Sequence, residues 1–321
     1  MNFEKIETAY ELILENIQLI ENELKTHIYD ALIEQNSFYL GAEGASEEVA
    51  ANNEKLRQLA LTKEEWRRAF QFIKAGQTEQ LQANHQFTPD AIGFILLFLI
   101  ENLTDSDKID LLEIGSGTGN LAQTFLNNSS KELNYLGIEV DDLLIDLSAS
   151  IAEVMDSDAR FIQEDAVRPQ ILQESDVIIS DLPVGFYPND DIAKRYKVAS
   201  SDEHTYAHHL LMEQSLKYLK KDGIAVFLAP VSLLTSKQSD LLKQWLKDYA
   251  DIIAVITLPE SIFGNVANAK SIFVLKKQAA QTPETFVYPL SDLQSRETLT
   301  DFIGKFQKWK VDNMNFKKNV I

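Results

Sequence analysis

The sequence lacks cysteine altogether, and it also lacks any apolar run long enough to cross a membrane. Without cysteine the chain can form no disulfide, iron–sulfur cluster or cysteine–zinc site, which fits a reducing compartment. The longest apolar run, residues 91–100, is too short to span a bilayer. The N-terminus has neither the basic region nor the cleavage site of a signal peptide. We therefore expect a cytoplasmic protein without a membrane association.

Basic residues are scarce relative to acidic ones. The chain has 30 lysines and arginines against 49 aspartates and glutamates, which gives a formal net charge of −19. Such an excess opposes non-specific adhesion to nucleic acid and to anionic lipid. Any binding to DNA is therefore expected to be weak or to depend on a partner subunit. The best basic patch, residues 194–197, is read as a solvated loop or as a phosphate contact.

The first 83 residues are predicted to form a helical domain. Apolar residues from Ile6 to Leu24 follow one helical stripe, with polar residues between them. Thr62 and Glu65 have the spacing of a capping box at the start of a later helix. Nothing in this region carries chemistry. It is expected to pack on itself or on a partner, and a homodimer formed through these helices is one option.

From residue 109 onward, strands and helices alternate. This pattern predicts a Rossmann-like, doubly wound α/β domain over residues 84–280, with a mostly parallel seven-stranded sheet. Residues 259–270 contain no convincing helix, so the last two strands are expected to form an antiparallel pair at one edge. Residues 281–321 are predicted to be a C-terminal extension that packs on this domain, with a further strand candidate at 286–288. The seven predicted strands are residues 110–114, 135–140, 159–163, 176–181, 224–229, 252–258 and 271–275.

A glycine-rich turn follows the first strand of this domain. Gly115, Gly117 and Gly119 stand at alternate positions directly before a helical pattern. Glycine permits a positive φ and the close approach of a ligand to the backbone. The free N–H groups at the start of a helix favour a polar or anionic ligand. The turn therefore predicts a nucleotide-like cofactor, with a structural turn that binds nothing as the alternative.

Polar residues also follow the next three strands. Glu139 lies twenty positions after Gly119 and is suited to bind a ribose diol, Asp165 follows the third strand, and Asp181 ends the fourth. Each could instead be a solvated strand end or a cap, but ligands bind at this edge of a doubly wound sheet. A dinucleotide-binding dehydrogenase shares the glycines and the later acid. The G-x-G-x-G spacing, with Glu113 before it, favours S-adenosylmethionine.

These motifs together resemble class I S-adenosylmethionine-dependent methyltransferases of the N6-adenine DNA type. The chain is most similar to the methylation subunits of type I restriction systems and to their small stand-alone relatives in Gram-positive bacteria. The resemblance runs from about Phe87 to Lys277. It implies that residues 84–280 are the catalytic domain and that S-adenosylmethionine is the cofactor. The cofactor-binding residues that it implies are Phe87, Thr88, Pro89, Glu113, Gly115, Ser116, Gly117, Thr118, Gly119, Asn120, Glu139, Val140, Asp165 and Ala166.

The segment Asp181-Leu182-Pro183-Val184 occupies the place of the family's Asn/Asp-Pro-Pro-Phe/Tyr motif. In that family the acidic or amide side chain and a backbone carbonyl accept the hydrogens of the adenine amine. An aromatic residue stacks on the flipped base. Here Leu182 replaces the first proline and Val184 replaces the aromatic residue. The resemblance therefore implies Asp181, Leu182 and Pro183 as catalytic residues, with Phe186 or Tyr187 as the replacement for the stacking side chain.

The expected function is methylation of adenine N6 in DNA. One alternative is a catalytically weak or partner-dependent module that binds S-adenosylmethionine. Others are methyl transfer to RNA, protein or a small molecule, and a dehydrogenase ranks last. We expect no metal site: His204, His208 and His209 share one predicted helix, but the chain lacks an H-E-x-x-H pattern.

Overall fold

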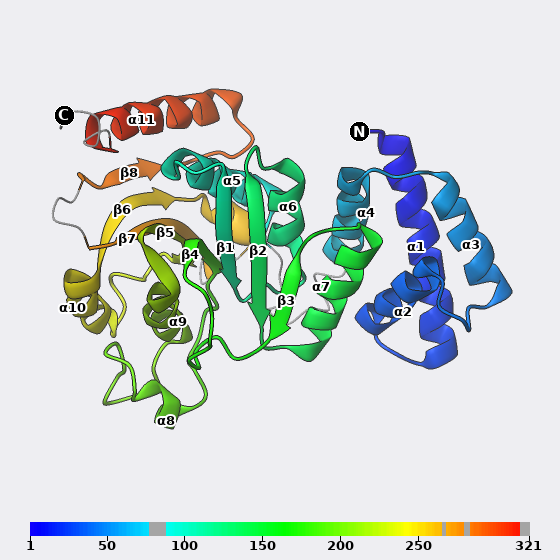
Figure 1. Ribbon diagram of the computed structural model, residues 1–321, viewed down its shortest axis with the longest axis horizontal. Coiled ribbons are helices and arrows are strands. Elements are labelled where there is room, and N and C mark those ends of the chain that lie inside the picture. The colour runs from blue at the N-terminus through cyan, green and yellow to red at the C-terminus, as the bar shows by residue number, and fades with distance from the viewer. Residues whose placement is uncertain (77–87, 265–267, 279–282, 315–321) are drawn as a thin grey trace. The chain divides into compact units, whose positions relative to one another are not determined.

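The computed structural model describes residues 1–76, 88–264, 268–278 and 283–314 (Figure 1). The chain divides into two compact units. The first comprises Met1–Gly93 and Ser116–Asp165, and the second comprises Phe94–Gly115 and Ala166–Ile321. The predicted Phe87 lies outside the described residues. Among the residues described, no helix is both long and apolar enough to cross a membrane.

Four N-terminal helices open the first unit: α1 (Phe3–Leu24), α2 (Ile28–Leu40), α3 (Glu47–Gln58) and α4 (Lys63–Ala75). The predicted capping box is present, because the Thr62 side chain accepts from the Glu65 N–H and the Glu65 side chain accepts from the Thr62 N–H. The α1 helix ends at Leu24, and the residue that follows it, Lys25, adopts a φ of 55°. The helical pattern of the first forty residues is therefore divided between two helices.

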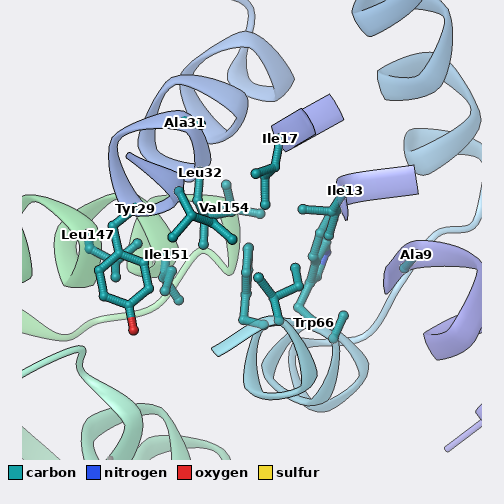
Figure 2. Packing of buried hydrophobic residues seen from close by; sticks show 14 of the residues in the cluster. Ala9, Ile13, Ile17, Tyr29, Ala31, Leu32, Trp66, Leu147, Ile151 and Val154 are labelled. Atoms are coloured by element: carbon teal, nitrogen blue, oxygen red, sulfur yellow. The ribbon is translucent and has the colours of Figure 1, made fainter. Parts of the chain in front are cut away.

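The core of the first unit joins these helices to α7 (Asp142–Val154). Ile13 and Ile17 of α1 pack in one buried cluster with Leu147 and Ile151 of α7 (Figure 2). The Asn36 amide of α2 also donates to the Ser150 hydroxyl of α7, at 3.0 Å. Truncating one buried isoleucine of this kind to alanine costs about 2–5 kcal/mol. The helical region thus shares its core with a helix of the α/β part of the chain.

The same unit contains α6 (Asn120–Asn128) and two parallel strands, β2 (Glu132–Glu139) and β3 (Arg160–Gln163). The α7 helix connects these strands, as a parallel crossover requires. In register, Glu139 at the end of β2 lies opposite Gln163 at the end of β3. Both strands therefore deliver the residues that follow them to one edge.

The described residues of the second unit form six strands in the order β1-β4-β5-β7-β6-β8. The β1, β4 and β5 strands run parallel, whereas β7 is antiparallel to both β5 and β6. The fold class is confirmed. The antiparallel pairing of the last two predicted strands is also present, but β7 lies between β5 and β6, and β8 forms an eighth strand beyond them. The bounds are β1 (Lys108–Ile114), β4 (Ser175–Asp181), β5 (Leu219–Pro230), β6 (Ala250–Thr257), β7 (Lys270–Lys277) and β8 (Phe286–Pro289).

The helices α8 (Asp190–Ala193), α9 (Ala207–Ser215), α10 (Ser239–Tyr249) and α11 (Arg296–Met314) belong to the second unit, and α5 (Asp90–Leu103) precedes β1. Two short 3₁₀ helices, Leu216–Tyr218 and Glu260–Phe263, complete the elements described. The C-terminal elements pack through aromatic rings: Phe286 of β8 meets Phe302, Phe306 and Trp309 of α11. Phe98 of α5 contacts the same group.

Candidate functional site

The three glycines of the predicted turn all adopt positive φ, at 70° for Gly115, 53° for Gly117 and 71° for Gly119. Their surroundings differ. A Cβ added at Gly115 or Gly117 would have no heavy atom of the described residues within 4 Å, apart from its chain neighbours. A Cβ at Gly119 would lie 3.1 Å from Ser148 Cβ and 3.2 Å from Phe161 Cζ. The first two glycines therefore leave open space beside the backbone, and the third permits close packing.

The turn leads into α6 without a side-chain cap. Gly119 is the N-cap residue, and no side chain among the described residues caps the helix there. The first N–H groups of a helix lack partners within it and can serve a ligand. The buried Ser116 hydroxyl likewise finds no hydrogen-bond partner in the described part of the chain. These donors, together with the open space at Gly117, fit the polar end of the expected cofactor.

Glu139 is oriented by three backbone N–H groups. Its Oε2 accepts from Gly117 at 2.8 Å, and its Oε1 accepts from Val140 at 2.8 Å and from Asp141 at 3.0 Å. A carboxylate offers about four lone-pair sites, so capacity remains for a hydroxyl donor. The sequence predicted this acid from its spacing. Its direct bond to the glycine turn could not be read from that spacing.

The other predicted cofactor residues are placed as follows. The segment with Asp165 adjoins Glu139, because the Glu164 N–H donates to the Glu139 carbonyl at 2.9 Å. Thr88 is buried, and its carbonyl accepts from the Asn120 side chain at 3.0 Å. Pro89 and Ala166 are half-buried, Glu113 is buried in β1, and Val140 is exposed. The first unit thus brings Thr88, the turn from Ser116 to Asn120, and Glu139 into one bonded group.

Lys74, which sequence reasoning missed, also contacts this group. Its Nζ lies 3.4 Å from Thr118 Oγ1 and 3.3 Å from Asn120 Oδ1, and the residue is only 3% exposed. Burial, together with the nearby Arg67 charge and against the opposing effect of Asp90, lowers the pKa of Lys74 to about 7. No motif in the sequence marks this lysine, because it stands in the last turn of a helix of ordinary composition.

Arg67, near the start of α4, forms an ion pair with Asp90, the first residue of α5. Its buried guanidinium donates to Asp90 at 2.8 and 3.0 Å, to Glu64 at 2.7 Å and to Thr124 Oγ1 at 3.1 Å. Burial opposes ionisation of Asp90, but hydrogen bonds from Arg67 and the charges of Arg67 and Arg68 outweigh it and lower the pKa. Since Asp90 follows Thr88-Pro89 directly, this ion pair fixes the chain next to the predicted cofactor residues.

In the second unit, Asp181 ends β4 opposite Leu228 of β5. Leu182 is fully buried, and its N–H donates to the Leu228 carbonyl at 2.9 Å. Lys270, the first residue of β7, forms an ion pair with Asp181 through Oδ1 and donates to the Leu182 carbonyl at 2.8 Å. One nitrogen therefore reaches both oxygens. The sequence carries no signal for this lysine, which lies 89 positions beyond Asp181.

The two candidate stacking residues differ in exposure. Phe186 is 51% exposed and stacks on Tyr206, with ring centroids 4.8 Å apart and planes inclined by 7°. Tyr187 is 8% exposed, and its N–H donates to the Thr205 carbonyl at 2.8 Å. Phe186 therefore offers an aromatic surface to a ligand, and Tyr187 belongs to the interior.

The three histidines do not share one helix, because His208 and His209 lie on α9 and His204 precedes it. His208 and His209 are buried, and burial lowers their pKa values to about 4 and about 3. His208 bonds the backbone of Pro183 and stacks on Tyr206 at 5.1 Å. His204 is exposed and bonds Asp190 at 2.8 Å, before α9 begins. His208 therefore packs beside Pro183 as a neutral ring, and His209 packs edge-on against it.

The basic patch at residues 194–197 offers no stacking aromatic. Tyr196 is buried, and its hydroxyl bonds the Val167 carbonyl and the Gln214 side chain. Lys197 lies over the Tyr249 ring, 4.4 Å from its centroid. The patch therefore presents charge without an exposed ring.

Comparisons with known proteins give one family. Residues 70–312 match the family model described as N-6 DNA Methylase. The uncharacterized protein YtxK of Bacillus subtilis is 34% identical over 325 residues, which cover 96% of this chain and 98% of that protein. A solved structure from Listeria monocytogenes, which is described as a class I S-adenosylmethionine-dependent methyltransferase, is 27% identical to this chain. The two superpose with a TM-score of 0.89, over 96% of this chain and 99% of the Listeria chain. The type I restriction-modification methyltransferase subunit of Streptococcus thermophilus has 14% identity and a TM-score of 0.65, over 94% and 74%, which shows the shared fold.

Proposed function

The chain belongs to the N-6 DNA methylase family, and we propose that this S-adenosylmethionine-dependent methyltransferase methylates the N6 amine of adenine in DNA. When bound, the cofactor supplies a methyl group activated by a positively charged sulfur. The residues of the chain must then hold the cofactor, bind the acceptor amine and remove its proton. Each of these tasks can be assigned to residues of one unit or the other.

For the cofactor, we assign the turn from Gly115 to Asn120 together with Glu139, Asp165 and Thr88. The positive φ and open space at Gly117 support this assignment, as do the uncapped N–H groups of α6. Glu139 would accept from the ribose diol, since its orientation is already fixed by three N–H donors. Glu113, Val140 and Ala166 remain flanking candidates, and Pro89 sets the backbone that follows Thr88.

One observation carries the assignment of the acceptor: Lys270 Nζ bonds both the Asp181 carboxylate and the Leu182 carbonyl. These two oxygens therefore converge on the position of a single nitrogen. An exocyclic amine carries two hydrogens, and two acceptors would localise its lone pair for attack. A hydroxyl or thiol acceptor carries only one hydrogen. The convergent pair thus favours an amine as the substrate group, and Asp181 is the proposed general base.

The departures from the family motif are compatible with this assignment. The catalytic group at the Leu182 position is a backbone carbonyl, which any residue supplies, and the leucine side chain is buried. Pro183 keeps its place, with its backbone bonded to His208. The missing aromatic residue at Val184 is replaced in this proposal by Phe186, which Tyr206 supports from behind. Base–aromatic stacking contributes about 1–3 kcal/mol per base.

The net charge of −19 supports a further element of the proposal, namely that DNA binding is weak without a partner subunit. The first experiment therefore incubates the protein with tritiated S-adenosylmethionine and either duplex DNA, single-stranded DNA or total RNA at low salt. Nucleoside chromatography identifies the product. We expect label in N6-methyladenine, and at least about a hundredfold less of it with Asp181→Ala.

Asp251→Ala, at the start of the β6 strand, serves as the matched control and should retain transfer. Equal labelling by Asp181→Ala and wild type would show that the catalytic group has been misplaced. Label in RNA alone, or in the protein fraction alone, would replace DNA by that acceptor. Retention of cofactor without transfer to any acceptor would favour the binding-module alternative.

A further inference from the structure

The ammonium of Lys270 donates hydrogen bonds to the same two oxygens that the proposed function assigns to the acceptor amine. Its Nζ is bonded to Asp181 Oδ1 and lies 2.8 Å from the Leu182 carbonyl oxygen. The Lys270 side chain is 15% exposed and that of Asp181 is 21% exposed. This pair is therefore shielded from water to a large extent. Charge-assisted bonds of this kind are roughly twice as strong as neutral ones.

The position of Lys270 in the sheet keeps its side chain at this place. It is the first residue of β7 and lies opposite Pro230, the last residue of β5. The neighbouring strand β4 ends in Asp181, which lies opposite Leu228 of β5. The two strand ends thus place the lysine and the carboxylate on either side of one central strand. The contact follows from strand register rather than from a surface side chain that happens to bend over.

We propose that Lys270 is an internal occupant of the acceptor-amine position, which an acceptor must displace before methyl transfer. The inference rests on the proposed function, because it takes Asp181 and Leu182 as the amine site. An amine donates two hydrogen bonds, and an ammonium donates up to three. The lysine can therefore satisfy both acceptor oxygens of the site, as the amine of a substrate would. Only an acceptor with further contacts, such as stacking on Phe186, can compete with it. Lys270 thereby sets the minimum binding strength that an amine acceptor needs in order to be methylated.

Competition of this kind has a specific kinetic signature. Removing the ammonium should lower the KM and Kd of the acceptor and leave the Kd of S-adenosylmethionine unchanged. A lysine that instead positions Asp181 would, when removed, lower kcat without tightening the acceptor. A lysine that is itself the acceptor would carry the methyl group. These three roles therefore differ in what is measured.

The test uses Lys270→Met, which keeps most of the side-chain length without the charge, and Lys270→Arg, which keeps the charge. Lys276→Met is the matched control, because Lys276 lies on the same strand, is half-buried as Lys270 is, and is an even number of positions away. Two fluorescent single-stranded oligonucleotides are compared, oligo-dA and the same length of 2′-deoxynebularine. The second lacks the N6 amine. Binding is measured in the presence of S-adenosylhomocysteine, so it does not depend on turnover.

We expect Lys270→Met to bind oligo-dA about tenfold more tightly than wild type, and the nebularine strand with unchanged affinity. Lys270→Arg and Lys276→Met should behave as wild type. Equal affinities of Lys270→Met and wild type for oligo-dA would overturn the proposal, as would a lower kcat without tighter binding. Methylated Lys270 in peptide mass maps of wild type would also overturn it. Lys270→Gln repeats the comparison if the methionine variant does not fold.

Failure of the internal-occupant inference and failure of the proposed function give different results. Tighter amine-dependent binding by Lys270→Met without transfer by any variant would uphold the internal occupant and refute the proposed methylation of adenine. Transfer to adenine by wild type, with no gain in affinity or in acceptor KM for Lys270→Met, would uphold the function and refute the occupant.

Discussion

The cofactor segment, residues 116–120 with Glu139, and the acceptor segment, residues 181–187, are built in different ways. In the cofactor segment, the Glu139 side chain accepts hydrogen bonds from one backbone N–H of the turn and from the backbone N–H groups of the two residues after Glu139. In the acceptor segment, the defining contacts come from side chains of distant elements, Lys270 on Asp181 and Tyr206 on Phe186. A site made from backbone groups constrains sequence spacing, whereas a site made from distant side chains does not. The first is therefore easier to recognise in a sequence.

The largest expected effect tests whether the cofactor segment depends on its backbone. Gly117→Val should weaken S-adenosylmethionine binding by at least about a hundredfold, because a branched side chain at a φ of 53° is strained and fills the open space beside the turn. Isothermal titration calorimetry measures the affinity. Gly41→Val is the matched control, since Gly41 also has a positive φ, 107°, and open space, but ends α2.

The control separates strain from ligand contact. Gly41→Val should lose stability through the same backbone strain and yet bind the cofactor as wild type does. Equal cofactor affinity in Gly117→Val and wild type would contradict the assignment of the turn. Equal losses of affinity in both variants would mean that strain alone explains the effect.

The fold could be predicted largely from the alternation of strands and helices. All seven predicted strands are present, because buried strands are short apolar runs and parallel crossovers need helices between them. The lack of a helical sequence pattern between the last two predicted strands correctly indicated that they pair antiparallel. Its insertion between β5 and β6 could not be predicted, because strand order depends on packing between distant segments. The 286–288 candidate proved to be an eighth strand.

The candidate site was predictable to the extent that it is local. The glycines and Glu139 could be named from their spacing, and Asp181 from its place at the end of a predicted strand. The structure brings Gly117 and Glu139 into direct contact. The sequence could not choose between Phe186 and Tyr187, which are adjacent and chemically similar. Only their exposure separates them. Lys74 and Lys270 were missed because a lysine has no motif, and each contacts residues more than forty positions away.

The next effect tests the acceptor segment through its exposed ring. Phe186→Leu should raise the KM for an adenine-containing acceptor by about 5- to 150-fold, which corresponds to the loss of about 1–3 kcal/mol of stacking. The Kd of the cofactor should not change. Tyr187→Phe is the control and should leave the acceptor KM unchanged, because Tyr187 is buried. If Tyr187→Leu, which removes that ring, raised the KM and Phe186→Leu did not, Tyr187 would be the stacking residue and exposure would be the wrong criterion for choosing between the two rings.

The smallest expected effect tests how far the cofactor segment also depends on a distant side chain, that of Lys74. Burial, with the Arg67 charge, lowers the pKa of Lys74 from 10.5 to about 7 in the folded chain. Between these two values the unfolded chain binds a proton that the folded chain does not. The free energy of unfolding should therefore rise with pH across this window, by up to about 1.4 kcal/mol per pH unit. Below pH 7 the lysine is charged in both states and this contribution is constant.

Urea unfolding at pH 7, 8 and 9 measures the slope. Lys74→Met should lose this part of the slope, whereas Lys63→Met, an exposed lysine of the same helix, should keep it. Identical slopes in Lys74→Met and wild type would mean that Lys74 stays protonated beside Thr118 and Asn120. Its two long contacts, at 3.4 and 3.3 Å, would then belong to an ammonium paired with Asn120. In that case the glycine turn would carry a fixed positive charge from α4, and the cofactor segment would resemble the acceptor segment in depending on a lysine from a distant element.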